Sequence, residues 1–96
     1  MDIFDNIAVQ LRAGSQNLLS PKESIVAAYL MMDYNTKGIS TALYREISTV
    51  KTQISSIKRK CKCKTNTKLG AVLYSFLKNS PVDYIQINRS GTYFIE

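Results

Sequence analysis

The sequence has 96 residues, of which 45% are hydrophobic and 21% charged, a composition typical of globular proteins. This length suits one small domain, because a second unit with its own core is rare below about 150 residues. With no His and only seven carboxylates, the sequence is poor in groups for acid–base chemistry or transition-metal binding, so we expect no enzyme, cofactor or metal site.

Membrane insertion and secretion are not expected either. The longest apolar run, residues 25–32, covers 8 residues, whereas a membrane-spanning helix needs about 20. The chain starts with Met-Asp-Ile-Phe-Asp and so has acids where a secretory leader would have Lys or Arg. We therefore expect a cytoplasmic protein without a membrane partner.

Positive charge is concentrated in the middle of the chain. Residues 37–68 include nine basic residues and one acidic residue, a net charge of +8, while the other 64 residues sum to −2. A basic stretch on a folded element is typical of polyanion binders, because each neutralised phosphate releases counterions. The alternative is a helix whose Lys-rich face is simply solvated.

Two helices are predicted in the first third of the chain. Residues 2–13 carry apolar side chains at helical spacing, and Gly14-Ser15 would end that helix. The next helix begins at Pro21, because Ser20 is a good N-cap, Pro suits the first position, and Glu23 completes a capping box. Its buried stripe is predicted to contain Ile25, Val26, Tyr29 and Met32.

The middle of the chain predicts a short helix and then a long basic one. Thr36 can cap a helix over 37–43, whose inner side would carry Ile39, Ala42 and Leu43. A long helix over 47–62 would bury Val50, Ile54, Ile57 and Cys61. Its opposite side would carry Lys51, Thr52, Ser55, Lys58, Arg59 and Lys62.

The last third predicts one more helix and a β-hairpin. Thr65-Asn66-Thr67 would start a helix that ends at Asn79-Ser80-Pro81. Its apolar face would carry Leu69, Val72, Leu73, Phe76 and Leu77. Residues 82–87 and 92–95 read as two strands around a turn at 88–91. This hairpin should pack on the outer side of the 67–78 helix or on a second chain.

A short helix, a tight connection and a long basic helix resemble a helix-turn-helix, whose second helix enters the major groove of DNA. The segment Leu19-Ser20-Pro21-Lys22-Glu23-Ser24-Ile25-Val26 resembles the opening of the LuxR-type DNA-binding domain, also called the GerE or NarL/FixJ effector domain, and looks especially like the bacterial Rcs-type regulators. The resemblance covers residues 19–77. Further matching positions are Lys37, Ile39, Leu43, Thr49-Val50-Lys51, Ile57 and Lys60.

The sequence departs from the family pattern at several positions. Arg45 and Glu46 stand where the family has an aliphatic residue and the Ser that caps the recognition helix, which leaves the capping of that helix open. Ile25 replaces an acid, Gly38 replaces a Glu, and Cys61 and Cys63 replace Leu and Val. These two thiols are expected to fill the core, because without His they supply only half of a zinc shell.

The residue patterns predict a mainly α fold with an N-terminal helical extension over 1–18 and a C-terminal β-hairpin extension over 80–96. Between these extensions, the resemblance implies a four-helix LuxR-type helix-turn-helix domain over 19–79. It implies base contacts from Lys51, Thr52 and Ser55, which can donate to guanine or touch a thymine methyl. The implied phosphate contacts are Lys37, Thr49, Lys58, Arg59 and Lys62. The implied dimerisation residues are Leu69, Val72, Leu73 and Phe76.

The expected function is therefore that of a sequence-specific transcriptional regulator that binds double-stranded DNA in the nucleoid, with residues 47–62 in the major groove. It is expected to act as a homodimer or as a heterodimer with another LuxR-type regulator. A phosphoacceptor or small-ligand domain is not expected, because 18 residues before the DNA-binding domain are too few to form one. The alternative is a protein-binding co-regulator that forms a heterodimer with a larger LuxR-type factor or inhibits it. A co-regulator would shift DNA only together with its partner.

Overall fold

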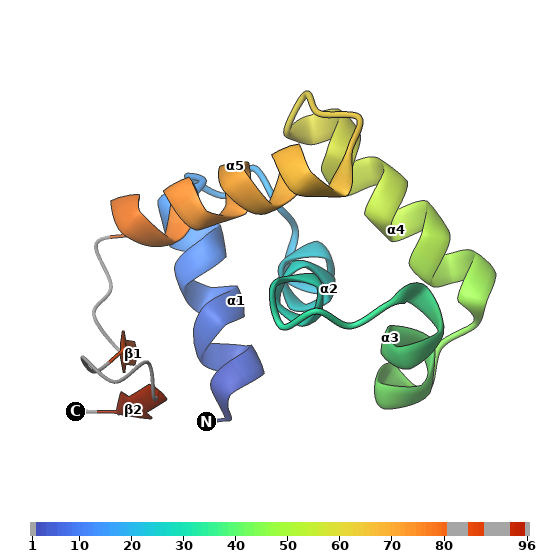
Figure 1. Cartoon of the computed structure of the whole chain (residues 1–96), viewed down its shortest axis with the longest axis horizontal. Helices are drawn as coiled ribbons and strands as arrows, with labels where there is room; N and C mark the ends of the chain where they lie inside the picture. The colour runs from blue at the N-terminus through green and yellow to red at the C-terminus, as the bar shows by residue number, and fades with distance from the viewer. Residues whose placement is uncertain (1, 81–84, 88–92, 96) are drawn as a thin grey trace.

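The computed structural model describes residues 2–80, 85–87 and 93–95, and this part of the chain is mainly α, as predicted (Figure 1). It contains the helices α1 (Ile3–Gly14), α2 (Pro21–Met31), α3 (Thr36–Leu43), α4 (Ile47–Lys60) and α5 (Asn66–Asn79), and the short strands β1 (Ile85–Ile87) and β2 (Tyr93–Ile95). Among the described residues, no helix combines the length and the apolar character needed to cross a membrane.

Side-chain caps set the starts of α1, α2, α3 and α5, largely where the sequence predicts these helices to begin. The capping box of α2 is complete: the Glu23 backbone N–H donates to Ser20 Oγ over 3.1 Å, and the Ser20 N–H donates to Glu23 Oε1 over 2.9 Å. Thr65 caps α5. The predicted cap of α3 is wrong by one residue, because Asn35, not Thr36, accepts from the Gly38 N–H over 2.7 Å. Asn is at least as good an N-cap as Thr.

The recognition-helix candidate α4 is shorter than predicted and ends at Lys60 instead of Lys62. Cys61 is the C-cap, and Lys62 has a left-handed backbone with a φ of 56°. The Cys63 N–H donates to the Lys58 carbonyl over 3.0 Å and the Lys62 N–H donates to the Arg59 carbonyl over 3.1 Å. These two bonds form a Schellman motif, which satisfies the last carbonyls and stops the helix.

One hydrophobic core joins all five helices. Helix α1 packs against α2 and α5, and α4 packs against α2 and α3 (Figure 1). Ile7 and Leu11 of α1 are buried in this core, so the predicted N-terminal extension packs into the same unit as the rest of the helices. The core residues are Ile7, Ala8, Leu11, Leu19, Val26, Ala27, Ala28, Ile39, Val50, Ile57, Cys63, Leu69 and Leu73.

The buried faces of α2 and α3 differ from the predicted stripes. In α2 the fully buried apolar residues are Val26, Ala27 and Ala28, while the predicted Ile25, Tyr29 and Met32 are half-buried. The reason is that α2 packs against all four other helices, and its small residues lie where these helices come close to it. In α3, Ile39 is buried and Leu43 half-buried as predicted, but Ala42 is exposed.

The two strands pair antiparallel, with Ile85 opposite Ile95 and Ile87 opposite Tyr93. The backbone of β1 lies beside α1 (Figure 1), whereas the prediction placed the hairpin on α5 or on a second chain. Residues 82–84 and 88–92, which include the predicted turn, lie outside the described residues. The hairpin as a complete unit therefore stays a prediction.

Candidate nucleic-acid interface

Helix α4 is held against the body by one face and leaves the other in solvent. Val50 and Ile57 of α4 are fully buried, and Ile54 packs against the same core. The short α3 precedes α4, and residues 44–46 connect the two helices at one end of the molecule (Figure 1). This is the arrangement that a helix-turn-helix requires: a scaffold helix, a tight connection and a second helix with a free outer face.

The three predicted base-contact residues share the exposed side of α4. Lys51, Thr52 and Ser55 are all exposed and lie within one turn of each other. The Thr52 hydroxyl donates to the Ser48 carbonyl over 2.9 Å, which holds the side chain in place. Thr52 can therefore offer its methyl group and an oxygen acceptor to a base edge, while Lys51 can offer a donor.

The structure does not gather all five predicted phosphate-contact residues on this side. Arg59 is exposed there and donates to Ser56 Oγ over 3.3 Å, and Lys58 is half-buried one residue earlier. Thr49 is exposed, but helical periodicity places it on the opposite flank of α4 from Lys58. Lys62 is exposed beyond the helix end, and Lys37 lies exposed in the first turn of α3.

A buried carboxylate that the sequence analysis assigned only to helix capping also fixes α4. Glu23 in α2 accepts from Lys60 Nζ over 2.7 Å and from Ser56 Oγ over 2.6 Å, both on α4. Burial raises the pKa of Glu23, but the hydrogen bonds from Lys60, Ser20 and Ser56, with the Lys60 charge, outweigh burial and lower this pKa to about 2. Glu23 is therefore ionised near neutral pH, and Lys60 is occupied by this contact.

The start of α4 lacks the side-chain cap that the family pattern has. Glu46 occupies the N-cap position, but its side chain makes no capping hydrogen bond with the described residues. Other contacts hold the connection: Ser40 Oγ donates to the Arg45 carbonyl, and Arg45 Nη1 donates to Gln53 Oε1 over 2.9 Å. Arg45 thus ties the connection to the second turn of α4.

Both cysteines contribute to the core, as expected, but Cys61 is less buried than Cys63. Cys63 is buried, with 8% of its surface exposed, whereas Cys61 is half-buried at the end of α4. Burial raises the pKa of the Cys61 thiol, and the nearby Cys63 and Glu23 add to this effect. Among the described residues, no three His, Cys, Asp or Glu side chains are grouped so that they could hold a metal ion.

The central residues of the predicted dimerisation face on α5 belong to the core of the chain itself. Leu69 and Leu73 are buried inside the chain, and Phe76 packs against the same core. Helix α1 comes so close to α5 that a Cβ built on Gly14 would lie 1.8 Å from the Phe76 carbonyl oxygen. The sequence analysis did not predict that α1 covers this face. Val72 is half-buried, and Tyr74 is the large side chain that α5 exposes.

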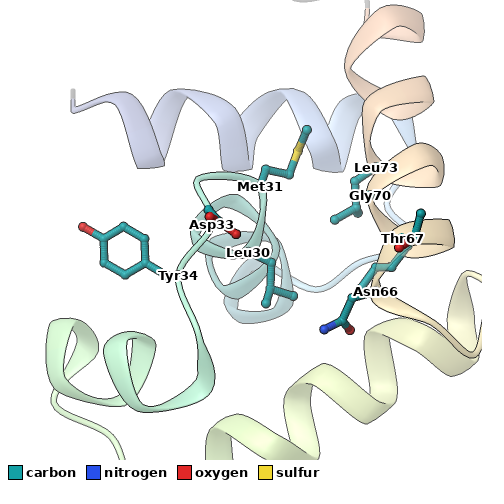
Figure 2. A pocket seen from close by; sticks show the side chains of 9 residues that line it. Leu30, Met31, Asp33, Tyr34, Asn66, Thr67, Gly70 and Leu73 are labelled. Atoms are coloured by element: carbon teal, nitrogen blue, oxygen red, sulfur yellow. The ribbon is translucent and has the colours of Figure 1, made fainter.

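A groove of about 260 Å³ lies apart from the exposed side of α4. Figure 2 shows its lining, which comes from the end of α2, the turn after it and the first half of α5. The lining combines apolar and polar side chains with one acidic group, Asp33, and it includes no residue of α4. It is lined by Leu30, Met31, Asp33, Tyr34, Asn66, Thr67, Leu69, Gly70 and Leu73.

Comparisons of this chain with protein-family models, with curated proteins and with solved structures found no match. The function is therefore inferred from the charge, exposure and arrangement of the helices themselves. Of these features, the exposed polar and basic side of α4 is the one that indicates a ligand class most specifically.

Proposed function

We propose that the protein is a sequence-specific transcriptional regulator of the LuxR type, which binds double-stranded DNA with α4 in the major groove. The observation that carries this proposal is the outer face of α4, where Lys51, Thr52 and Ser55 are exposed together. These side chains supply the donor, methyl and hydroxyl groups that distinguish base pairs in the major groove. The helix follows a scaffold helix and a tight connection, as in other proteins of this docking geometry.

Electrostatics supports the same partner. Residues 37–68 have a net charge of +8, and Lys37, Arg59 and Lys62 are exposed within this stretch. DNA phosphates are the polyanion that such a surface would meet beside a readout helix. The proposal includes a bacterial nucleoid location and two copies on one operator, with a dimer contact outside the buried Leu69 and Leu73.

One observation favours the second candidate, a co-regulator that binds a larger LuxR-type factor. Three large hydrophobic side chains that belong to neither α3 nor α4 are exposed, namely Leu18, Tyr34 and Tyr74, with 41%, 39% and 57% of their surfaces exposed. Exposed apolar groups of this size are common at protein contacts when they form a patch. They do not account for the exposed polar side of α4, so DNA binding is the first proposal.

The deciding experiment is the selection of bound duplexes from a random double-stranded pool by the purified chain alone. A regulator of the proposed kind enriches a defined sequence, and its affinity for that duplex falls steeply as salt rises. If the protein alone enriches no sequence, the proposal is contradicted. A sequence enriched only after a LuxR-type factor is added would favour the co-regulator.

A further inference from the structure

Tyr44 occupies a position where its side chain costs the fold stability. It follows α3 with a left-handed backbone, φ 53° and ψ 47°, and closes the helix through the Tyr44 and Arg45 N–H groups. Helices α1, α2 and α4 are also followed by non-glycine residues of positive φ, and all of these are polar, namely Gln16, Asn17, Asp33 and Lys62. Glycine is the usual residue at such a site, because a Cβ strains the left-handed conformation.

The Tyr44 side chain gains no packing that would offset this strain. It is 96% exposed, the largest exposure among the large hydrophobic residues described, and no hydrogen bond or ring contact with the described residues involves it. Strain at an exposed residue points to a role outside the folding of the chain. The position of the residue, in the connection between α3 and α4, indicates where that role lies.

Ile47 adds a second exposed apolar group at the same end of α4. It is the first residue of the helix and is 43% exposed, and Lys51 follows it one turn later. In a helix-turn-helix, the N-terminal part of the second helix comes closest to the base edges. Tyr44 and Ile47 therefore extend the proposed readout surface beyond the polar residues Lys51, Thr52 and Ser55.

We propose that Tyr44 and Ile47 form an apolar contact with DNA, in which Ile47 reads the methyl group of a thymine and Tyr44 lies against the adjacent sugar and phosphate. This inference rests on the proposed function and adds a base preference to it. Thymine is the one base with a methyl group in the major groove, and aliphatic side chains recognise it by contact. One helical turn is about 5.4 Å and one base-pair step about 3.4 Å, so the thymine lies within about two base pairs of the Lys51 contact.

The test for Ile47 uses the duplex selected from the random pool. Each thymine is replaced in turn by uracil, which removes only the methyl group. We expect one replacement to weaken binding about fourfold, the effect of losing one buried methyl-sized group. The Ile47→Ala variant should bind the thymine and uracil duplexes equally well, and this loss of discrimination identifies the contact.

The test for Tyr44 uses Tyr44→Gly, a substitution that favours the fold. Glycine removes the left-handed strain, so the melting temperature should stay equal or rise, while affinity for the selected duplex should fall at least threefold. Loss of binding therefore cannot come from unfolding. Tyr74→Ala, which removes an exposed tyrosine from α5, is the matched control and should leave DNA affinity unchanged.

The outcomes separate this inference from the function on which it rests. If the protein enriches no duplex, both the inference and the proposed function are overturned. Enrichment with no sensitivity to uracil, or with the same sensitivity in wild type and Ile47→Ala, overturns the thymine contact and leaves DNA binding in place. Unchanged DNA affinity of Tyr44→Gly together with a changed mass in sedimentation makes Tyr44 a protein contact and also overturns the inference.

Discussion

Two lysines of α4 show that the environment of a cation, more than its presence in a basic stretch, decides what it can bind. Lys60 lies 2.7 Å from the Glu23 carboxylate, and its side chain is 32% exposed. Lys51 is exposed, and no contact with the described residues holds its ammonium group. The net charge of residues 37–68 therefore overestimates the number of cations that are free to contact DNA. Of the two lysines, Lys51 is the better candidate for base readout.

The first prediction separates these two lysines. Lys51→Ala should weaken binding to the selected duplex by about 1–3 kcal/mol and leave binding to a scrambled duplex nearly unchanged, because a base contact is lost. Lys60→Ala should lower the free energy of unfolding, because it leaves the buried Glu23 carboxylate without its ion pair. Fluorescence anisotropy with both duplexes and urea unfolding measure these effects. Equal losses of Lys51→Ala on both duplexes would contradict the base contact.

At the scale of the element, Glu23 connects the start of α2 to the last two turns of α4. Its lowered pKa means that the folded chain prefers the ionised carboxylate more strongly than the unfolded chain does. This contribution to stability is fully present above the ordinary pKa of 4.5 and is lost as pH falls toward about 2. Acid should therefore loosen the attachment of the proposed recognition helix.

The second prediction concerns Glu23→Gln. At pH 7 this variant should be less stable than wild type by about 2–3 kcal/mol, because it loses the ion pair with Lys60. The difference should shrink as pH falls from about 4.5 to about 2, where wild type loses the same contribution. Urea unfolding at several pH values measures it. Glu46→Gln, at an exposed carboxylate without a capping bond, is the control, and a constant difference across the pH range would refute the assignment.

The elements that the sequence predicted correctly are those set by local contacts. Ser20, Pro21 and Glu23 act on each other within four residues, so the start of α2 could be placed from sequence. The end of α4 and the burial of Cys63 depend on a Schellman turn that carries no glycine signal. The contact of Glu23 with Lys60 spans 37 residues, and no local pattern announces it.

The predicted dimer face on α5 is largely covered, and the reason is a tertiary contact. The apolar stripe of α5 was identified correctly, but its partner is α1 of the same chain. The signal that could have suggested this is Gly14, since a glycine at a helix end also permits a close approach of backbones. Within the candidate site, Lys51, Thr52 and Ser55 were found to be exposed as expected, because exposure on an amphipathic helix follows from its period.

The third prediction tests the crossing of α1 and α5. Gly14→Ala should destabilise the fold by about 3 kcal/mol or more, because the added Cβ would overlap the Phe76 carbonyl oxygen. Gly70→Ala is the matched control, since a Cβ there meets nothing within 4 Å. Alanine at that helical position should stabilise the protein by about 0.5–1 kcal/mol. Thermal unfolding measures both variants, and equal effects would show that α1 does not cross α5 at Gly14.

At the scale of the whole molecule, charge is distributed unevenly along the chain. Three of the seven acids, Asp2, Asp5 and Asp33, lie at the start of α1 and after the end of α2, whereas the cations gather in and around α4. Such an asymmetry orients a protein in the field of DNA before contact and raises the association rate at low salt. The side of α4 that faces solvent is thus also the side that DNA would attract.

The fourth prediction follows from this asymmetry and concerns Lys58 and Arg59, which are assigned to phosphates and not to bases. Lys58→Ala and Arg59→Ala should weaken binding to selected and scrambled duplexes alike, because phosphates carry no sequence information. Each substitution should also reduce the slope of log K against log salt by about one, since one fewer counterion is released. Binding isotherms at several salt concentrations measure the slope. Lys78→Ala on α5, far along the chain from α4, should leave the slope unchanged. If Arg59→Ala also leaves the slope unchanged, Arg59 is an ordinary surface cation whose partner is Ser56, and the phosphate contacts lie elsewhere on the basic stretch.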